Sequence, residues 1–407
     1  MTLSLAARIA VVAAAALAAA GCAGKKKDES GLAVSKPRPV VQPSVGMQQR
    51  FGDEIVVAGH FYRIGTPVVT WMDPGGYDAY RTSRHFAPYR EASYEATTRE
   101  IAEANAGRRQ REDSIRSPDR YGLRYTDATT RATSRAATQP GGISDYVAKN
   151  YATPSTRPLS DEQFNQVRNG GWPLELLQEK VDQFVLHYDV AGTSANCFKV
   201  LHDGRGYSVQ LMLDLDGTIY QTLDLKERAY QATKANDRSI GIEIANIGSY
   251  GINETQGPLQ AWYKKDENGQ TYISIPERLG GMNSQRTKPT VLRPARNEAI
   301  VAEIQGGQQR MYDLTPQQYA ALIKLTAALA DVFPKIKLDY PKDPSGKLIT
   351  RALSDTAWGR YQGVLGHYHV QTNKSDPGAA FQWDHLIDNA RRELAARKGA
   401  PALLAKQ

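Results

Sequence analysis

Hydrophobic and polar positions alternate most clearly at residues 239–245 (SIGIEIA), where isoleucines occupy every second position and Glu243 lies on the opposite face. Because successive side chains of a strand point to opposite faces, this segment predicts a strand with one aliphatic and one polar face. The run QFVLHY at residues 183–188 predicts a second short strand and places His187 near its end.

Turn and capping signals add a hairpin and three helices. The Asp-Gly pair at residues 216–217, between two short β-type runs, is a strong signal for a hairpin. Residues 160–163 (SDEQ) have the spacing of a capping box and predict a short helix ending at Gly170-Gly171. Thr315-Pro316 begins a helical pattern that Pro334 closes, and residues 379–397 repeat apolar side chains at helical spacing.

This order of strands and helices predicts one α/β domain over residues 155–397, with a mixed central β-sheet flanked by helices. Residues 249–310 inside it are polar and Gly-rich, and we expect an irregular insertion there. Residues 51–96 form an N-terminal segment whose β-rich part, 54–72, predicts a short hairpin. We expect residues 398–407 to be a tail.

The region between these parts has a different composition. Residues 81–140 contain 12 Arg, no Lys and 8 acidic residues, with few large aliphatic side chains. A long helix at 91–113 is possible, whereas 114–145 has the character of a solvated linker. We therefore expect residues 97–154 to be an Arg-rich linker, partly helical or disordered.

The first 22 residues are typical of an exported protein. Residues 3–20 are apolar and Ala-rich, contain the single basic residue Arg8, and precede Gly21-Cys22. This pattern predicts a signal peptide over 1–21 and resembles a bacterial lipoprotein signal, in which the cysteine becomes lipidated. An uncut membrane anchor is the alternative, although the run is short for the about 20 residues of a spanning helix. Residues 22–50, rich in Lys, Ser and Pro, then predict a flexible tether.

Composition narrows the classes of protein further. The chain has 407 residues, of which 41% are hydrophobic, and this excludes wholesale disorder. Two cysteines, Cys22 and Cys197, exclude a disulfide framework, and we expect Cys197 to be a buried structural residue. The net charge of +8 is modest for this length and favours an anionic surface as partner. We expect no nucleic-acid partner, and the oligomeric state stays open.

Two regions bring metal-ligating residue types together. His187 ends a strand, and His367 and His369 lie in GHYHV shortly before Asp376 in KSDPG. Two imidazoles and one carboxylate leave a fourth tetrahedral position open, which is the pattern of a catalytic zinc site. On residue types alone, a metal site and a set of core histidines are equally supported.

Four blocks resemble a known family: FVLHYD at 184–189, LDGTIYQ at 215–221, SIGIEIAN at 239–246 and GHYHVQTNKSDPGAAFQW at 366–383. In this order they are similar to the type 2 N-acetylmuramoyl-L-alanine amidases, a family that includes phage lysozyme-type amidases and the peptidoglycan recognition proteins. The resemblance covers about 155–397 and implies the α/β fold of that family. The first 150 residues are not covered.

The resemblance also implies roles for individual residues. The zinc ligands would be His187, His367 and Asp376. Glu243 would be the catalytic acid and base, and its place on the polar face of its strand agrees with this role. Lys374 would stabilise the oxyanion, although a solvated turn lysine is the alternative.

Two positions differ from the family pattern or compete with it. Tyr230 stands where many members have a histidine, and we expect Tyr230 and Asn246 to contact the substrate. His369 is two residues from His367, so on an extended segment both side chains would point the same way. His369 is therefore a rival ligand, and His367 is favoured because it follows the glycine of the Gly-His pair.

Together these features predict a zinc-dependent hydrolase, an N-acetylmuramoyl-L-alanine amidase of the bacterial cell envelope. It would cut the amide between N-acetylmuramic acid and L-alanine in peptidoglycan or muropeptides, in cell-wall degradation, remodelling or recycling. It would be held by lipid at Cys22 and face the periplasm or the exterior. The alternative is a non-catalytic lipoprotein that binds peptidoglycan or anchors the wall.

Overall fold

The structure is a computed structural model, and it describes residues 50–79, 163, 173–205, 207–254 and 256–399. These belong to one compact unit, Arg50–Gln407. The predicted signal peptide (1–21), the tether (22–50, apart from Arg50), the linker (97–154) and the helix at 91–113 lie outside the described residues. The same holds for the predicted helix at 160–170, apart from Gln163, and for most of the tail.

A six-stranded mixed sheet lies at the centre, in the order β13-β4-β7-β5-β6-β3. Its neighbouring strands are parallel except for β5 and β6, which form the antiparallel hairpin expected around the Asp-Gly pair. The strands are β3 (Val68–Thr70), β4 (Gln183–Tyr188), β5 (Leu211–Leu213), β6 (Ile219–Gln221), β7 (Ser239–Ile244) and β13 (Gly363–Gly366). The predicted fold class, a mixed sheet flanked by helices, is confirmed.

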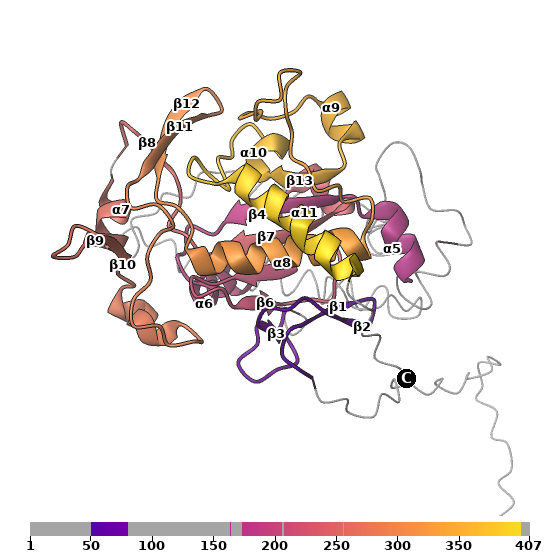
Figure 1. The fold of residues 1–407 in the computed structure, drawn as a ribbon, viewed down its shortest axis with the longest axis horizontal. Coiled ribbons are helices and arrows are strands. Elements are labelled where there is room, and N and C mark those ends of the chain that lie inside the picture. The colour runs from indigo at the N-terminus through magenta and orange to yellow at the C-terminus, as the bar shows by residue number, and fades with distance from the viewer. Residues whose placement is uncertain (1–49, 80–162, 164–172, 206, 255, 400–407) are drawn as a thin grey trace, which may run out of the picture. The chain divides into compact units, whose positions relative to one another are not determined.

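One face of the sheet packs against two long helices, α8 (Pro316–Val332) and α11 (Trp383–Gly399), which lie side by side (Figure 1). The isoleucines of β7 point to this face and are fully buried with Phe184 and Leu186 of β4. The predicted capping box of α8 is present, because Thr315 accepts from the Gln318 backbone and Gln318 bonds back to Thr315.

A short helix, α5 (Leu174–Lys180), joins this core through Leu176 and Leu177. The opposite face is covered by shorter helical elements: α6 (Ser194–Phe198), η3 (Lys199–Gly204), η4 (Thr233–Asp237), α9 (Asp355–Arg360) and α10 (His367–Val370). Of these, α6 contributes Cys197 to a buried cluster with Val69 and Met212, as expected for a structural cysteine. None of these short elements was predicted, since runs of about one to two turns show too little periodicity. The face turned away from α8 and α11 is the one that carries His187 and Glu243.

The N-terminal segment joins the central sheet. β1 (Glu54–Val57) and β2 (His60–Arg63) form the predicted antiparallel hairpin. β3 then leaves this hairpin and pairs in parallel with β6, about 150 residues further along the chain. The buried aliphatic side chains Ile55, Val57 and Ile64 pack into the main core, and Phe61 stays exposed.

The insertion at 249–310 was predicted to be irregular, and this prediction is wrong because the segment contains regular secondary structure. It contains β8 (Tyr250–Gly251), α7 (Gly257–Trp262), β9 (Tyr263–Lys265), β10 (Thr271–Ile273), η5 (Glu277–Leu279), η6 (Gly281–Ser284), β11 (Ile300–Ile304) and β12 (Gly307–Met311). β8, β11 and β12 form one small sheet, and β9 pairs with β10. A separate apolar cluster around Trp262 and Ile273 holds the insertion together against Ala245 and Ile247, just beyond β7. Short strands among polar residues leave little signal in the sequence, which explains the error.

The last helix starts later than predicted, at Trp383 and not at 379. Gly378 has a φ of +98°, a left-handed conformation, and its carbonyl accepts from the Phe381 amide, so a turn precedes the helix. In the part of the chain that the structure describes, no helix has both the length and the apolar character needed to span a membrane.

Candidate metal centre

Parallel pairing brings the predicted site residues to one edge of the sheet. In the register of β4 and β7, His187 lies beside Glu243. β13 pairs with β4 so that Gly366 lies beside Leu186, which puts His367, the next residue, at the level of His187. The carboxyl ends of parallel strands are the edge where α/β folds place their ligands.

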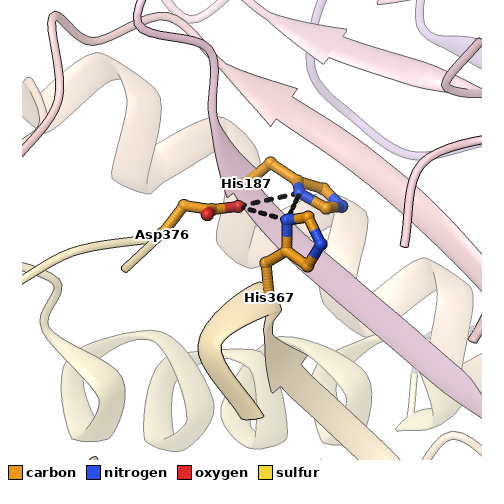
Figure 2. A group of neighbouring side chains, drawn as sticks. All are labelled: His187, His367 and Asp376. Carbon is orange, nitrogen blue, oxygen red and sulfur yellow. Dashed lines mark hydrogen bonds and ion pairs between the residues drawn. The ribbon is translucent and has the colours of Figure 1, made fainter. Parts of the chain in front are cut away.

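His187, His367 and Asp376 converge on one point (Figure 2). Asp376 Oδ2 lies 2.8 Å from His187 Nδ1 and 2.9 Å from His367 Nδ1, and the two nitrogens are 2.9 Å apart. All three side chains are buried. Burial by itself raises the pKa of Asp376, whereas positive charge next to it, as on protonated His367 or His187, would lower this pKa well below its usual range.

A relay of hydrogen bonds orients the His187 ring. The hydroxyl of Ser239 donates to the carbonyl of Ala235, so its oxygen is free to accept from Gln231 Nε2 at 3.1 Å. This fixes the amide of Gln231 with its Oε1 toward His187 Nε2, 2.6 Å away. The His187 proton is therefore on Nε2, and the lone pair of Nδ1 points to the centre.

His367 is oriented in the same manner by a different glutamine. Gln371 Oε1 lies 2.6 Å from His367 Nε2 and accepts a hydrogen bond from it. Gln371 is the residue just after α10, four positions from His367, and its backbone N–H bonds to the His367 carbonyl, which brings the two side chains together. The sequence analysis missed both glutamines. Helical spacing from His367 would have identified Gln371.

This donor set fits a metal ion. With protons on both Nε2 atoms, two nitrogen lone pairs and one carboxylate oxygen face one another with no proton between them. Such an arrangement is favourable around a cation and repulsive without one. Two imidazoles and a carboxylate match the ligands and the number of protein ligands of catalytic zinc sites.

Glu243 lies beside this group without belonging to it. Its side chain is half-buried, and loss of solvent raises the pKa of Glu243 to about 8. The charge of Asp376 adds to the increase, and that of Lys374 acts against it. A positive ion at the centre would lower this pKa toward neutrality, where a general acid or base works best.

Lys374 and the segment around it are held close to the centre. Its ammonium group is near enough to Glu243 to affect the pKa of that carboxyl group, and its side chain is half-buried. The neighbouring Ser375 hydroxyl bonds to the hydroxyl of Tyr188 from the end of β4. Lys374 therefore lies close to Glu243, and its role in stabilising an oxyanion stays a prediction.

His369 is excluded as a ligand by its own contacts. Its Nδ1 accepts from the backbone N–H of Gly366 at 2.9 Å, and its Nε2 donates to the carbonyl of Ile349 at 2.6 Å. Burial lowers the pKa of His369 to about 3, so the ring is neutral. The expectation of an extended segment was wrong: residues 367–370 are helical, so side chains two apart point in different directions.

The remaining predicted residues lie outside the ligand group. Tyr230 is half-buried under the guanidinium of Arg228, and its neighbour Gln231 is the residue that reaches His187. Asn246 is buried, with its side chain bonded to the backbone of Gly248 and Tyr312. Substrate contact by Tyr230 and Asn246 stays a prediction. Cys22 lies outside the described residues.

Comparison with known families agrees with this geometry. Residues 177–379 match the N-acetylmuramoyl-L-alanine amidase family. This part of the chain belongs to that family. The matched region contains all three residues of the metal-ligand group together with Glu243 and Lys374, so the amidase domain holds every residue of the centre described above.

Three solved structures are similar to this chain. The N-acetylmuramyl-L-alanine amidase AmiD from E. coli, in complex with the substrate anhydro-N-acetylmuramic acid-L-Ala-D-gamma-Glu-L-Lys, is 17% identical (TM-score 0.28); the match covers 54% of this chain and 59% of that chain. A selenomethionine derivative of AmpD is 15% identical (52% and 86%, TM-score 0.25). The endolysin N-acetylmuramoyl-L-alanine amidase LysCS from Clostridium intestinale URNW is also 15% identical (53% and 86%, TM-score 0.27). A comparison with curated protein sequences finds no match.

The SIGIE block of the amidase domain now has a physical explanation. Its three non-aliphatic residues share one face of β7: Ser239 holds Gln231, and Glu243 lies beside His187. Gly241 stands between them, and a Cβ atom there would lie 1.9 Å from Gln231 Oε1. A glycine is therefore required for Gln231 to cross the strand and reach His187.

Proposed function

We propose that the chain is a zinc-dependent amidase that hydrolyses the bond between N-acetylmuramic acid and L-alanine in peptidoglycan or muropeptides. The observation that carries this proposal is the convergence of His187 Nδ1, His367 Nδ1 and Asp376 Oδ2 within 2.9 Å of one another, with a glutamine oxygen 2.6 Å from the Nε2 atom of each ring. The family of residues 177–379 supports the choice of substrate.

In this proposal, His187, His367 and Asp376 hold the zinc ion, and the two glutamines keep the imidazole rings in the required tautomer. The ion would polarise the substrate carbonyl and make water a stronger nucleophile at neutral pH. The chain's own residues then handle the protons and the developing charge.

Glu243 accepts a proton from the attacking water and returns it to the nitrogen of the leaving L-alanine. Its position beside His187, and a pKa that burial raises to about 8, support this role. Lys374 presents its positive charge to the carbonyl oxygen as this oxygen becomes negative.

Digestion of purified peptidoglycan tests the proposal. We expect new N-terminal alanine and the matching stem peptides by mass analysis. The activity should disappear after treatment with a chelator and return when zinc is added. Only three protein atoms hold the ion, so a chelator can remove it, and the proposed reaction needs the ion.

A protein that retains one equivalent of zinc and binds peptidoglycan without releasing alanine would contradict the amidase and favour a wall-binding protein. Release of the stem peptide by a fully zinc-free sample would contradict the metal dependence.

We further propose that the protein is tethered to a bacterial membrane by lipid at Cys22, facing the periplasm or the exterior. The apolar stretch at residues 3–20 followed by Gly21-Cys22 supports this. Cys22→Ser should abolish labelling with a radioactive fatty acid and release the protein from the membrane fraction. Cys197→Ser is the matched control, since that cysteine is buried in the domain. Absence of label in the wild type would refute the lipid anchor.

A further inference from the structure

The tip of the β11–β12 hairpin contains a strained glutamine. Ile304 pairs with Gly307, so Gln305 and Gly306 form a two-residue turn, and both have positive φ, +54° and +78°. Glycine and asparagine are favoured at such positions, whereas the left-handed conformation is unfavourable for other residues because Cβ comes too close to a carbonyl oxygen. The strain at Gln305 therefore needs a compensating contact.

The side chain of Gln305 supplies that contact. Its Nε2 lies 2.9 Å from the carbonyl oxygen of Tyr368, 2.8 Å from that of Gln371 and 3.3 Å from that of Lys374. Its Oε1 accepts from the backbone N–H of Ala352 at 3.2 Å. One side-chain amide group thus donates hydrogen bonds to three backbone carbonyls of a single segment.

That segment, residues 367–376, carries most of the metal centre. Tyr368 is adjacent to His367, Gln371 orients the His367 ring, and Lys374 is two residues before Asp376. The segment's own backbone bonds, Tyr368 N–H to Asp376 and Gln371 N–H to His367, close it into a loop. Gln305 joins this loop from outside, at three points.

The rest of the insertion contacts the chain just after the loop. The end of β12 packs on Gly378, where a Cβ atom would lie 2.2 Å from Met311 Sδ. Arg296 forms an ion pair with the buried Asp313 and also donates to the carbonyl of Ala380. The hairpin is therefore anchored next to the loop, which allows its tip to fix the loop's position.

We propose that Gln305 is a positioning residue, through which the inserted hairpin holds the loop 367–376 and so sets the geometry of Asp376 and Lys374. This inference rests on the proposed function in assigning a metal ion to the centre. It gives the 249–310 insertion a role in the reaction that the three ligands alone do not show.

Two substitutions distinguish the effect of the Gln305 side-chain amide from the effect of the strained turn. Gln305→Glu keeps the size of the side chain but places a carboxylate oxygen against three carbonyl oxygens. Gln305→Gly removes the side chain and suits the positive φ, so the hairpin stays intact. Gln308→Glu makes the same chemical change on an exposed side chain of the same hairpin and is the matched control.

Three measurements apply to each variant: amide hydrogen exchange of residues 367–376 in the metal-free protein, the rate of zinc release to a chelator, and kcat and KM on peptidoglycan fragments. In both Gln305 variants we expect faster exchange in this loop and zinc release that is faster by roughly 10–100-fold, the usual effect of removing groups that support metal ligands. We expect kcat to fall by a similar factor with KM changed less than threefold. Gln308→Glu should match the wild type.

Exchange and zinc release equal to the control in Gln305→Gly would overturn the proposal, whether or not Gln305→Glu folds. A uniform change in exchange across the whole domain would also overturn it, because the role would then be global stability. A wild type that holds zinc without releasing alanine would refute the amidase alone, since exchange and zinc release still measure the effect of Gln305.

Discussion

Glu243→Gln should reduce the release of N-terminal alanine from peptidoglycan by roughly 10²–10⁴-fold, the usual contribution of a general acid–base group. Glutamine keeps the shape and the hydrogen-bonding capacity of the side chain but cannot take up a proton. Glu243 lies beside His187 without being a ligand, so one equivalent of zinc and binding to insoluble peptidoglycan should both persist. Alanine release, zinc content and a pull-down on the same polymer are measured together.

Asp189→Asn is the matched control, because Asp189 is a carboxylate near the same edge of the sheet whose pKa burial also raises, to about 8. Its Oδ1 accepts from the backbone of Ala191, Gly192 and Asn246, so its role is in the loop after β4. An asparagine oxygen can still accept these bonds, so the control should keep most of its turnover. Unchanged alanine release in Glu243→Gln would remove Glu243 from the mechanism, and loss of zinc would make it part of the metal site.

The raised pKa of Glu243 gives the same variant a second effect, on stability. In the metal-free protein the folded state keeps this carboxyl group protonated up to about pH 8, while the unfolded chain ionises near the ordinary glutamate pKa of 4.5. Between these pH values the unfolded state binds fewer protons than the folded state. The contribution of Glu243 to the free energy of unfolding therefore falls as the pH rises. Urea denaturation should show Glu243→Gln stabilised relative to the wild type at pH 8 and not at pH 4. A pH-independent difference would contradict the raised pKa.

The second large effect is expected at His367. His367→Ala should lose zinc and hydrolysis together, because two protein ligands bind the ion much more weakly than three. The fold should survive, since removal of His367 also removes one of three mutually repelling acceptors in the metal-free centre. Zinc content, alanine release and urea denaturation are measured on the purified variant.

His369→Ala should give the opposite result and serves as the control. It leaves the buried Gly366 N–H and Ile349 carbonyl without a partner, and each orphaned group costs about 1–3 kcal/mol. We expect a lower free energy of unfolding with zinc still bound in the folded fraction. The reverse pattern, with zinc lost from His369→Ala and kept by His367→Ala, would move the ligand by two residues.

Local patterns of the sequence predicted those elements whose stabilising contacts are close along the chain. The capping box at Thr315, the Asp-Gly hairpin at 216–217 and the alternation in β7 are each complete within a few residues. The ligands were found by resemblance, since their motif residues stand next to diagnostic neighbours such as Gly366 and Pro377. By contrast, β3 has three residues and a partner about 150 positions away, and no local period shows such a pairing.

For the site, the sequence by itself determined the residue types and the face of β7 on which Glu243 stands, because strand alternation is a property of the backbone. Only the tertiary structure decided between His367 and His369, since the turn of α10 directs one ring to Asp376 and the other to Ile349. It also brought Gln231 and Gln305 to the centre from segments 44 or more residues away from the ligands they support. Such contacts depend on strand register and on the close approach of backbones, and these are fixed only when the whole sheet has formed.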